Sequence, residues 1–298
     1  MLVSIAFENF IRTRYLSGLS DKAIESYRLL TARFISYIGN DTCMEDITQE
    51  NIDEFIDSLL SSALSRSSVA SYLRNTRIFL KWYQEKNSVQ YNAKEIKVPK
   101  TPKKIIHLYT PKEIKLIFDS VHTCEVWIDA RNKAMIALML DSGLRQGEIC
   151  SLKLKNVYFT ESCIKVCGKG NKERFVPLGK LTAKYLKDYL LLRPHESESV
   201  FTNIHGMDLT CNAVKSMTYD LQKILPFEFS SHKLRHNFAT NYLINQYEQF
   251  GIMDIYKLMS VMGHEDVSTT RKYLHEANSI LSARNCISHL DKCLLAIA

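Results

Sequence analysis

The sequence predicts a mainly α-helical protein of two domains, with a β-hairpin or small three-strand sheet in the second. Apolar residues recur at three- and four-residue intervals over most of the chain, as on one face of an amphipathic helix. The period changes around "CIKVCGKGNKERFVPLG", residues 163–179, where two short β-patterned runs flank a Gly-rich turn. At 298 residues the chain is long enough to bury a core in each domain.

The pattern predicts helices throughout the first domain, residues 1–96, and gives one of them a basic side. In residues 20–38 Ser20 is a candidate N-cap, and apolar residues follow it at helical spacing. In residues 65–86 the apolar set defines a core face, and a separate stripe consists of Arg74, Arg77 and Lys81. One side of this helix can therefore pack while the other contacts phosphates in a major groove.

Charge is distributed unevenly along this first domain. Residues 41–57 contain seven acidic residues and no Lys or Arg, whereas residues 66–104 contain ten Lys or Arg against two acids. The chain as a whole carries a formal charge of +7. This polarity implies that one face turns toward a polyanion and another turns away from it.

A basic linker separates the two domains. The segment "KVPKTPKK", residues 97–104, is rich in proline and lysine and has no apolar periodicity. The second domain, residues 105–298, begins with a capping box in which Thr110 is the N-cap and Glu113 the third helical residue. One helix stops at Gly143 and a second short one begins at once in "LRQGEICSLKL", residues 144–154. Helical patterns resume from about residue 212 and finish in an apolar terminal helix at about residues 279–298.

Composition excludes several classes of protein. Charged residues make up 24% of the chain and no apolar run approaches the roughly 18 residues that span a bilayer. The N-terminus is apolar and then basic, the opposite order to a signal peptide. The cysteines form no CxxC pair and lack the His spacing of zinc sites. We therefore expect a cytoplasmic protein with reduced thiols and with no metal, cofactor or membrane partner.

The stretch "SSHKLRHNFATNYL", residues 230–243, places cations at a helix start. One of its serines can cap the helix, and His232, Arg235 and His236 share one face of the first turn. A helix N-terminus carries partial positive charge and ordinarily attracts acidic side chains. A cationic first turn therefore suits an external anion such as phosphate.

Polar residues at other helix starts, turns and glycine stops extend this cluster. They are Arg145 in "GLRQGE", Lys169 in "GKGNKER", His264 in "MGH", and Tyr273, which follows on a helix that Ser268 could cap. Each residue alone has an ordinary surface or structural explanation. Together they form the set that cutting a phosphodiester without a metal requires.

The chemistry assigns a role to each member. Attack on a phosphate builds negative charge that the guanidiniums of Arg145 and Arg235 can stabilise. A tyrosine hydroxyl, with a pKa of about 10, needs cations or a base to act as a nucleophile, and His232 is the candidate base. Lys169 can protonate the departing 5′-oxygen, and His264 can hydrogen-bond the phosphate.

Two further side chains are expected to support this set. Glu148 lies one helical turn after Arg145 and can orient Arg145 or His232. His236 follows Arg235 directly in the sequence. Neither is expected to contact the reacting atoms.

The ordered motifs "GLRQGE", "GKGNKER", "HKLRHNFAT" and "MGH", together with Tyr273, resemble the catalytic domain of the tyrosine recombinases, the phage integrase and Xer-like family. The resemblance covers roughly residues 105–278, and the basic helical segment before it resembles the family's core-binding domain. It implies that Tyr273 forms a covalent 3′-phosphotyrosine. The residues that it places around the phosphate are Arg145, Lys169, His232, Arg235 and His264.

The resemblance also implies an assembly. The two domains would form a C-shaped clamp around double-stranded DNA, and four copies would bind two duplexes with paired half-sites. The terminal helix would dock into a neighbouring copy, although packing on its own domain is the alternative. Accessory DNA-bending proteins or a sister recombinase are further expected partners, and DNA binding would place the cytoplasmic protein at the nucleoid. The residues expected to contact DNA are Lys22, Arg28, Arg74, Arg77, Lys81, Lys100, Lys103 and Lys104.

The implied activity is the integration, excision or resolution of DNA, and two other functions stay open. A type IB topoisomerase uses a similar cation set and tyrosine but relaxes DNA as a monomer. A DNA-binding regulator would carry the same pocket unused. The compact helical first domain and the terminal helix favour the recombinase, and the match at all six positions argues against an inactive pocket.

Overall fold

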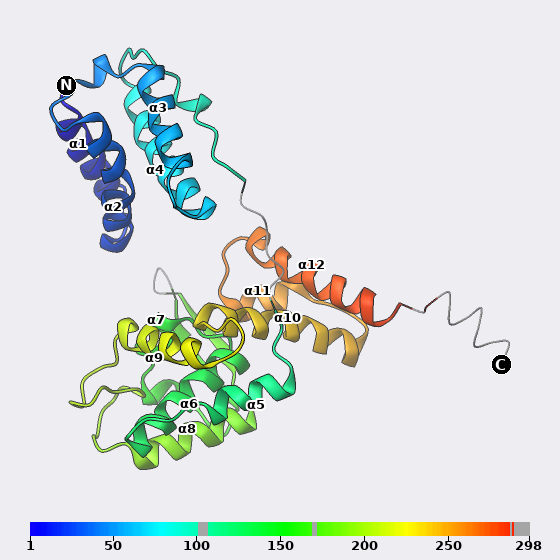
Figure 1. Cartoon of the computed structure of the whole chain (residues 1–298). Coiled ribbons are helices and arrows are strands. Elements are labelled where there is room, and N and C mark those ends of the chain that lie inside the picture. The colour runs from blue at the N-terminus through cyan, green and yellow to red at the C-terminus, as the bar shows by residue number, and fades with distance from the viewer. Residues whose placement is uncertain (101–106, 169–171, 287, 289–298) are drawn as a thin grey trace. The chain divides into compact units, whose positions relative to one another are not determined.

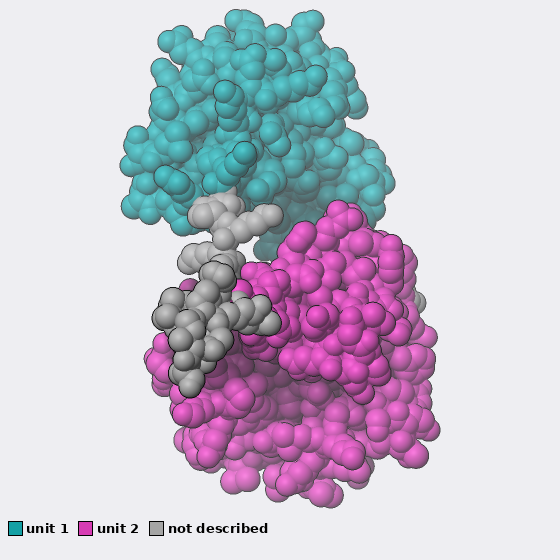
Figure 2. All heavy atoms as spheres, turned by 90° about the vertical axis from the view of Figure 1, so that its right-hand side faces the viewer, with its two compact units in different colours: residues 1–104 teal, residues 105–298 magenta. Residues whose placement is uncertain are grey.

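The structure, a computed structural model, describes residues 1–100, 107–168, 172–286 and 288. It divides into two compact units, Met1–Lys104 and Ile105–Ala298 (Figure 1, Figure 2). The prediction of a mainly helical fold with one small sheet is confirmed. Among the described helices, none is both long and apolar enough to cross a bilayer.

Within its described residues the first unit has four α-helices, which pack around an aromatic core. Figure 1 shows their course. The ring centroid of Phe10 lies 5.5 Å from that of Phe79 and 5.5 Å from that of Trp82. Large aromatic side chains bury the most area per residue, so a few of them give a small unit a sufficient core. The helices are α1 (Val3–Leu16), α2 (Asp21–Ile38), α3 (Gln49–Leu60) and α4 (Arg66–Gln84).

Helix α4 has the two sides that its sequence predicts. Leu73 and Leu80 are buried in the core of the unit, together with Phe79. Arg74 and Lys81 are exposed, and Arg77 is half-buried with its guanidinium donating to the carbonyl of Ile96 at 3.5 Å. The basic stripe of α4 therefore lies outside the core.

The second unit combines eight helices with an antiparallel sheet in order β1-β2-β3 within its described residues. Helix α6 packs along α8, and α10 packs against both α6 and α12. The helices are α5 (Pro111–Asp119), α6 (Val126–Asp141), α7 (Gln146–Cys150), α8 (Lys180–Leu192), α9 (Cys211–Ile224), α10 (Ser231–Phe250), α11 (Ile255–Met262) and α12 (Val267–Arg284). The strands are β1 (Val157–Tyr158), β2 (Cys163–Cys167) and β3 (Glu173–Pro177).

Local signals explain most helix ends in this unit. Thr110 forms the predicted capping box with Glu113, and Ser230 caps α10 by accepting from the Lys233 amide at 3.2 Å. The suggestion that Ser268 caps α12 is wrong. The cap is Asp266, whose carboxylate accepts from the Ser268 amide at 2.8 Å and leaves Ser268 inside the first turn.

Gly143, which ends the α6 segment, brings α6 and α10 together. Its φ is +64°, in the left-handed region that favours glycine, and a Cβ there would collide with the ring of Phe238 on α10. This close approach places the start of α7 beside the first turn of α10. The cations predicted at those two helix starts therefore meet.

The C-terminal segment is divided between α12 and residues outside the description. Residues 279–284 of the predicted terminal helix continue α12, and Leu281 is buried in the core of its own unit with Ile280 packed against it. Residues 287 and 289–298 lie outside the described residues, so the rest of that prediction is not tested.

Candidate active site

Two helix starts, one turn and helix α12 bring the predicted catalytic residues of the second unit together. Arg145 precedes α7, and Arg235 and His236 lie in the first turns of α10. His264 follows α11, and Tyr273 lies on α12. Lys169 lies outside the described residues, as do Lys103 and Lys104.

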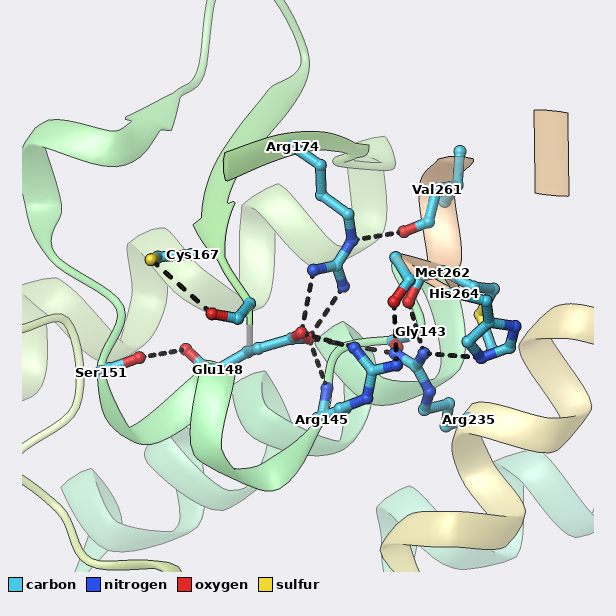
Figure 3. A network of polar contacts seen from close by, with 12 residues as sticks. Gly143, Arg145, Glu148, Ser151, Cys167, Arg174, Arg235, Val261, Met262 and His264 are labelled. Atoms are coloured by element: carbon cyan, nitrogen blue, oxygen red, sulfur yellow. Dashed lines mark hydrogen bonds and ion pairs between the residues drawn. The ribbon is translucent and has the colours of Figure 1, made fainter. Parts of the chain in front are cut away.

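The carboxylate of Glu148 is the centre of this cluster (Figure 3). It accepts from the Arg145 amide at 2.8 Å and from Arg145 Nη1 at 2.9 Å. Arg174 of β3 donates to both oxygens, each at 2.9 Å, and Arg235 Nη1 lies 3.9 Å away. Burial alone would raise the pKa of Glu148, but the hydrogen bonds from Arg174 and from the Arg145 amide hold that pKa below its usual value.

Arg235 is a buried cation whose donors are used by carbonyls. Its guanidinium donates to the carbonyl of Gly143 and, at 2.6 Å, to that of Met262. Burial, reinforced by Arg145, lowers its pKa to about 10, so Arg235 stays charged at neutral pH. A buried cation held by backbone dipoles is already oriented before an anion arrives.

The hydrogen bonds of His264 define its tautomer. Its Nε2 lies 3.4 Å from Arg235 Nη2, which can only donate, so Nε2 accepts and the proton is on Nδ1. Nδ1 then donates to Thr270 Oγ1 at 2.8 Å. Burial, followed by the charges of Arg235 and Arg145, lowers the pKa of His264 to about 4. The imidazole is therefore neutral at pH 7 in the absence of a bound anion.

Tyr273 packs against two imidazole rings. Its ring centroid is 6.2 Å from that of His264, with the planes 11° from parallel, and 4.8 Å from that of His236. Its side chain is 3% exposed, and burial raises its pKa against the opposing effect of Arg235. The hydroxyl is therefore protonated at neutral pH and needs a base or further cations to become a nucleophile.

His232 lies in the first turn of α10, and its side chain is exposed. Partial burial and the charges of Lys272 and Arg235 lower its pKa, which leaves it a neutral imidazole able to accept a proton at pH 7. The ammonium of Lys272 lies 4.8 Å from the ring centroid of Tyr273. Lys272 therefore lies on the Tyr273 side of the cluster, and its charge also acts on His232.

A cavity of about 780 Å³ opens beside these residues. Its walls come from the start of α7, from both sides of the β2–β3 turn and from the α11–α12 turn. Lys172 and Glu265, whose Nζ and Oε1 are 2.6 Å apart, join two of these walls. The lining carries both signs of charge, with the cations Arg145, Lys172 and Arg174 and the acids Glu173, Glu265 and Asp266.

Comparison with known proteins identifies the family. Residues 108–279 match the phage integrase family, and residues 7–90 match the phage integrase N-terminal SAM-like domain. The first match spans 172 of the 298 residues. The chain belongs to the phage integrase family of tyrosine recombinases.

Curated relatives of this recombinase are tyrosine recombinases by name. Tyrosine recombinase XerD of Haemophilus influenzae is 31% identical over 276 residues, which cover 89% of this chain and 90% of that protein. XerD of Halalkalibacterium halodurans is 28% identical over 270 residues, covering 87% and 88%. These relatives do not favour a topoisomerase or a regulator.

Solved structures share the fold of this recombinase. The XerH site-specific recombinase bound to palindromic difH substrate, in a post-cleavage complex, matches with a TM-score of 0.70 and 24% identity, over 88% of this chain and 78% of that one. A lambda integrase dimer bound to a core site matches with a TM-score of 0.73 and 15% identity, over 92% and 95%. At these identities the likeness concerns the fold.

The recombinase site includes two cations that the sequence analysis missed, Arg174 and Lys272. Arg174 shares the inward face of β3 with buried Val176, while Phe175 between them is 58% exposed. An arginine at an inward position of a strand was the available signal, because such a residue requires a buried partner. Lys272 directly precedes Tyr273, and only the fold shows that its ammonium lies over that ring.

Proposed function

We propose that this recombinase cuts and rejoins double-stranded DNA at specific sites through a covalent bond between Tyr273 and a 3′-phosphate. One observation carries the proposal: Arg145 and Arg235 both approach Glu148, while Arg235 contacts His264 and His264 stacks on Tyr273. Fixed cations are thereby placed beside a tyrosine. Such an arrangement stabilises the charge that develops on a phosphate under attack.

The proposed first step transfers a phosphoryl group from DNA to the protein. Tyr273 Oη attacks phosphorus, the bond from phosphorus to the 5′-oxygen breaks, and the tyrosine proton passes to His232. Lys169 supplies a proton to the departing 5′-oxygen. Arg145 and Arg235 stabilise the non-bridging oxygens with charge-assisted hydrogen bonds.

The second step reverses the first with a different 5′-hydroxyl. The phosphotyrosine bond retains the free energy of the broken phosphodiester, so rejoining requires no ATP. Attack by a 5′-hydroxyl from the other duplex exchanges strands, whereas attack by the original one restores the starting DNA. The outcome therefore depends on which end is held near the phosphotyrosine.

His264 adopts its role when the phosphate binds. Its Nε2 accepts from Arg235 in the structure, so this nitrogen has no proton to donate to a phosphate. An anionic phosphate would raise the pKa of His264 and replace its Nε2 as acceptor for Arg235, and a protonated Nε2 would then donate to the phosphate. Glu148 and His236 stay behind the reacting atoms.

DNA binding by the first unit is part of the same proposal. Its exposed basic residues include Lys22 on α2, Arg74 and Lys81 on α4, and Lys100. Arg28 is engaged differently, because its Nη2 donates to Glu8 on α1 at 2.8 Å. We expect Arg28 to contribute to DNA binding only if that ion pair opens.

The proposed assembly has four copies on two duplexes with paired half-sites, and each copy would grip DNA as a clamp between its two units. Structural relatives are recorded with their DNA substrates, which supports DNA as the partner. Integration, excision or resolution of DNA in the cytoplasm, at the nucleoid, follows from the same proposal. Accessory DNA-bending proteins or a sister recombinase would join the assembly where the sites require them.

The test is trapping of the covalent intermediate. Wild-type protein and Tyr273→Phe are incubated with nicked duplexes from the flanks of the gene, and adducts are separated on denaturing gels. Tyr256→Phe is the matched control, since Tyr256 is 70% exposed at the start of α11. The proposal expects adducts from wild type and Tyr256→Phe alone. An adduct that survives in Tyr273→Phe would exclude Tyr273 as the nucleophile.

A further inference from the structure

A buried polar pair joins the helix of Arg235 to the helix of Tyr273. His236 on α10 is 1% exposed, and its Nε2 is hydrogen-bonded to Oε2 of Glu276 on α12. Thr240 Oγ1, one turn further along α10, lies 3.4 Å from the same oxygen. The rest of the α10–α12 interface is built largely from apolar side chains such as Leu243, Ala277 and Leu281.

The pair has a defined direction. An ionised carboxylate only accepts, so the imidazole proton is on Nε2 and His236 donates to Glu276. The other ring nitrogen, Nδ1, is buried without a hydrogen-bond partner. Burial lowers the pKa of His236 against the opposing effect of Glu276, which agrees with a neutral ring that donates at one end. A hydrogen bond of this kind fixes both the imidazole plane and the carboxylate.

Glu276 follows Tyr273 by three residues, so both side chains lie on the same face of α12. The ring of His236 also touches Tyr273 directly, with centroids 4.8 Å apart and planes at 55°. Rotation or sliding of α12 along α10 would break the bond to Glu276 and move Tyr273 away from His264. An interface of apolar side chains alone would tolerate such a shift, because apolar contacts have no direction.

We infer that His236 and Glu276 are positioning residues that set the orientation of Tyr273 against the rings of His236 and His264. This inference deepens the proposed function, since it concerns the residue assigned there as the nucleophile. Neither side chain touches the reacting atoms. Their effect on cleavage is exerted through the place and the packing of the tyrosine.

Two pairs of substitutions distinguish the effect of the hydrogen bond from the effect of filling the same volume with a side chain. In His236→Gln the amide nitrogen can take the place of Nε2 and still donate to Glu276. In His236→Asn the shorter amide reaches only the place of Nδ1, so the bond to Glu276 is lost. Glu276→Gln keeps an acceptor oxygen, and Glu276→Ala removes it.

The first readout is single-turnover cleavage of a nicked duplex, measured beside the dissociation constant for the same DNA. We expect His236→Asn and Glu276→Ala to cleave about 100-fold more slowly, since small misplacement of a reacting group costs rate rather than binding. DNA affinity should be unchanged, and His236→Gln and Glu276→Gln should cleave at nearly the wild-type rate. Cleavage that is equal in His236→Asn and His236→Gln would overturn the inference.

The second readout does not depend on cleavage. Nitration of Tyr273 by tetranitromethane is followed by mass spectrometry in the tryptic peptide 273–284, which contains a single tyrosine. Tyr219, 64% exposed and the single tyrosine of peptide 216–223, is the internal reference. Tyr273 should resist nitration in wild type and His236→Gln and become reactive in His236→Asn. Protection in all three proteins would contradict the inference.

The two readouts distinguish this inference from the proposed function. If wild-type protein forms no adduct on any duplex, the proposed function fails, and the nitration pattern alone decides whether His236 and Glu276 hold Tyr273. If wild type forms an adduct and His236→Asn cleaves equally fast, the positioning role fails while the proposed function stands. Melting temperatures of all variants show whether a loss is one of folding.

Discussion

At the scale of single residues, burial and neighbouring cations set the protonation state of the site before a phosphate binds. Arg235 keeps its charge because carbonyl groups accept from its guanidinium, and His264 stays neutral because it is buried and its neighbours are positive. Tyr273 stays protonated because it is buried. A phosphate anion would raise the pKa of His264 and keep Arg235 charged, but it would not ionise Tyr273, which still needs a base.

The lowered pKa of His264 predicts a dependence of stability on pH. Its pKa is about 4 in the folded protein against 6.5 for an ordinary histidine, so the unfolded chain binds more protons between those values. Stability is therefore complete above about pH 6.5 and is lost as the pH falls toward 4, by at most about 3 kcal/mol for this residue. His232 and His236, whose pKa values are also lowered, add to the same trend.

The measurement is denaturant unfolding at several pH values between 4 and 7 for wild type and His264→Gln. Glutamine can still accept from Arg235 but does not titrate, so the variant should lose less stability on acidification than wild type. His275→Gln, at an exposed position of α12, is the matched control and should follow wild type. If acidification lowers the unfolding free energy of His264→Gln as much as that of wild type, His264 is not a buried neutral group.

At the scale of elements, strand β3 connects the parts that carry the site. Arg174 donates to both oxygens of Glu148 on α7, and its Nε donates to the carbonyl of Val261 on α11 at 2.7 Å (Figure 3). A Cβ on Gly263 would lie 3.0 Å from the Arg174 guanidinium, so that turn is shaped around it. One side chain thus ties the β2–β3 turn to the positions of Arg145 and His264.

Replacement of Arg174 by lysine tests this connection. A single ammonium cannot supply parallel bonds to two carboxylate oxygens and a third to a carbonyl. We expect Arg174→Lys to lose about 3 kcal/mol in unfolding free energy, since it weakens a buried ion pair, and to cleave DNA more slowly at unchanged affinity.

Arg193→Lys is the control for a structural arginine. Its guanidinium holds the carbonyls of Ser199 at 2.8 Å and Ser197 at 3.1 Å, and it contacts none of the site residues. That variant should lose stability while its folded molecules cleave at the wild-type rate. Equal cleavage rates in Arg174→Lys and Arg193→Lys would show that Arg174 has no specific role in the site.

The arrangement of helices and strands also shows which site residues can be predicted from the sequence and which cannot. Arg145, Arg235, His264 and Tyr273 could be predicted because each lies beside a cap, a glycine or a motif that is visible along the chain. Arg174 and Glu276 could not, because their partners are 26 and 40 residues away and only packing brings them together. The cap of α12 was misassigned for a different reason, since Asp266 and Ser268 are both good N-cap residues.

At the scale of the whole molecule, the charge asymmetry of the first unit predicts how its DNA affinity depends on salt. Arg74, Arg77 and Lys81 form the stripe of α4, and each phosphate contact contributes about 0.9 to the slope of log K against log salt. Replacing all three by glutamine should therefore reduce that slope by up to about 3.

The measurement is a binding titration at several salt concentrations, on specific and on unrelated DNA. Glu50→Gln with Asp53→Asn on α3 is the matched control, because it also changes the charge of the first unit but at its acidic helix. The control should leave the slope unchanged. A wild-type affinity that is independent of salt would contradict phosphate contact by the basic stripe.

Shortening the chain at its C-terminus tests whether the molecule acts alone or in a ring. Because α12 runs to Arg284 and Leu281 is buried in its own unit, removal of everything after Asn278 would damage the helix of Tyr273. A chain that ends at Asn285 keeps α12 whole and removes only residues 286–298. If that segment docks into a neighbouring copy, the shortened protein should bind a single half-site as wild type does but fail to assemble on paired sites and to exchange strands. Light scattering on paired half-sites and a recombination assay check this, and normal assembly by the shortened chain would show that the segment serves its own copy.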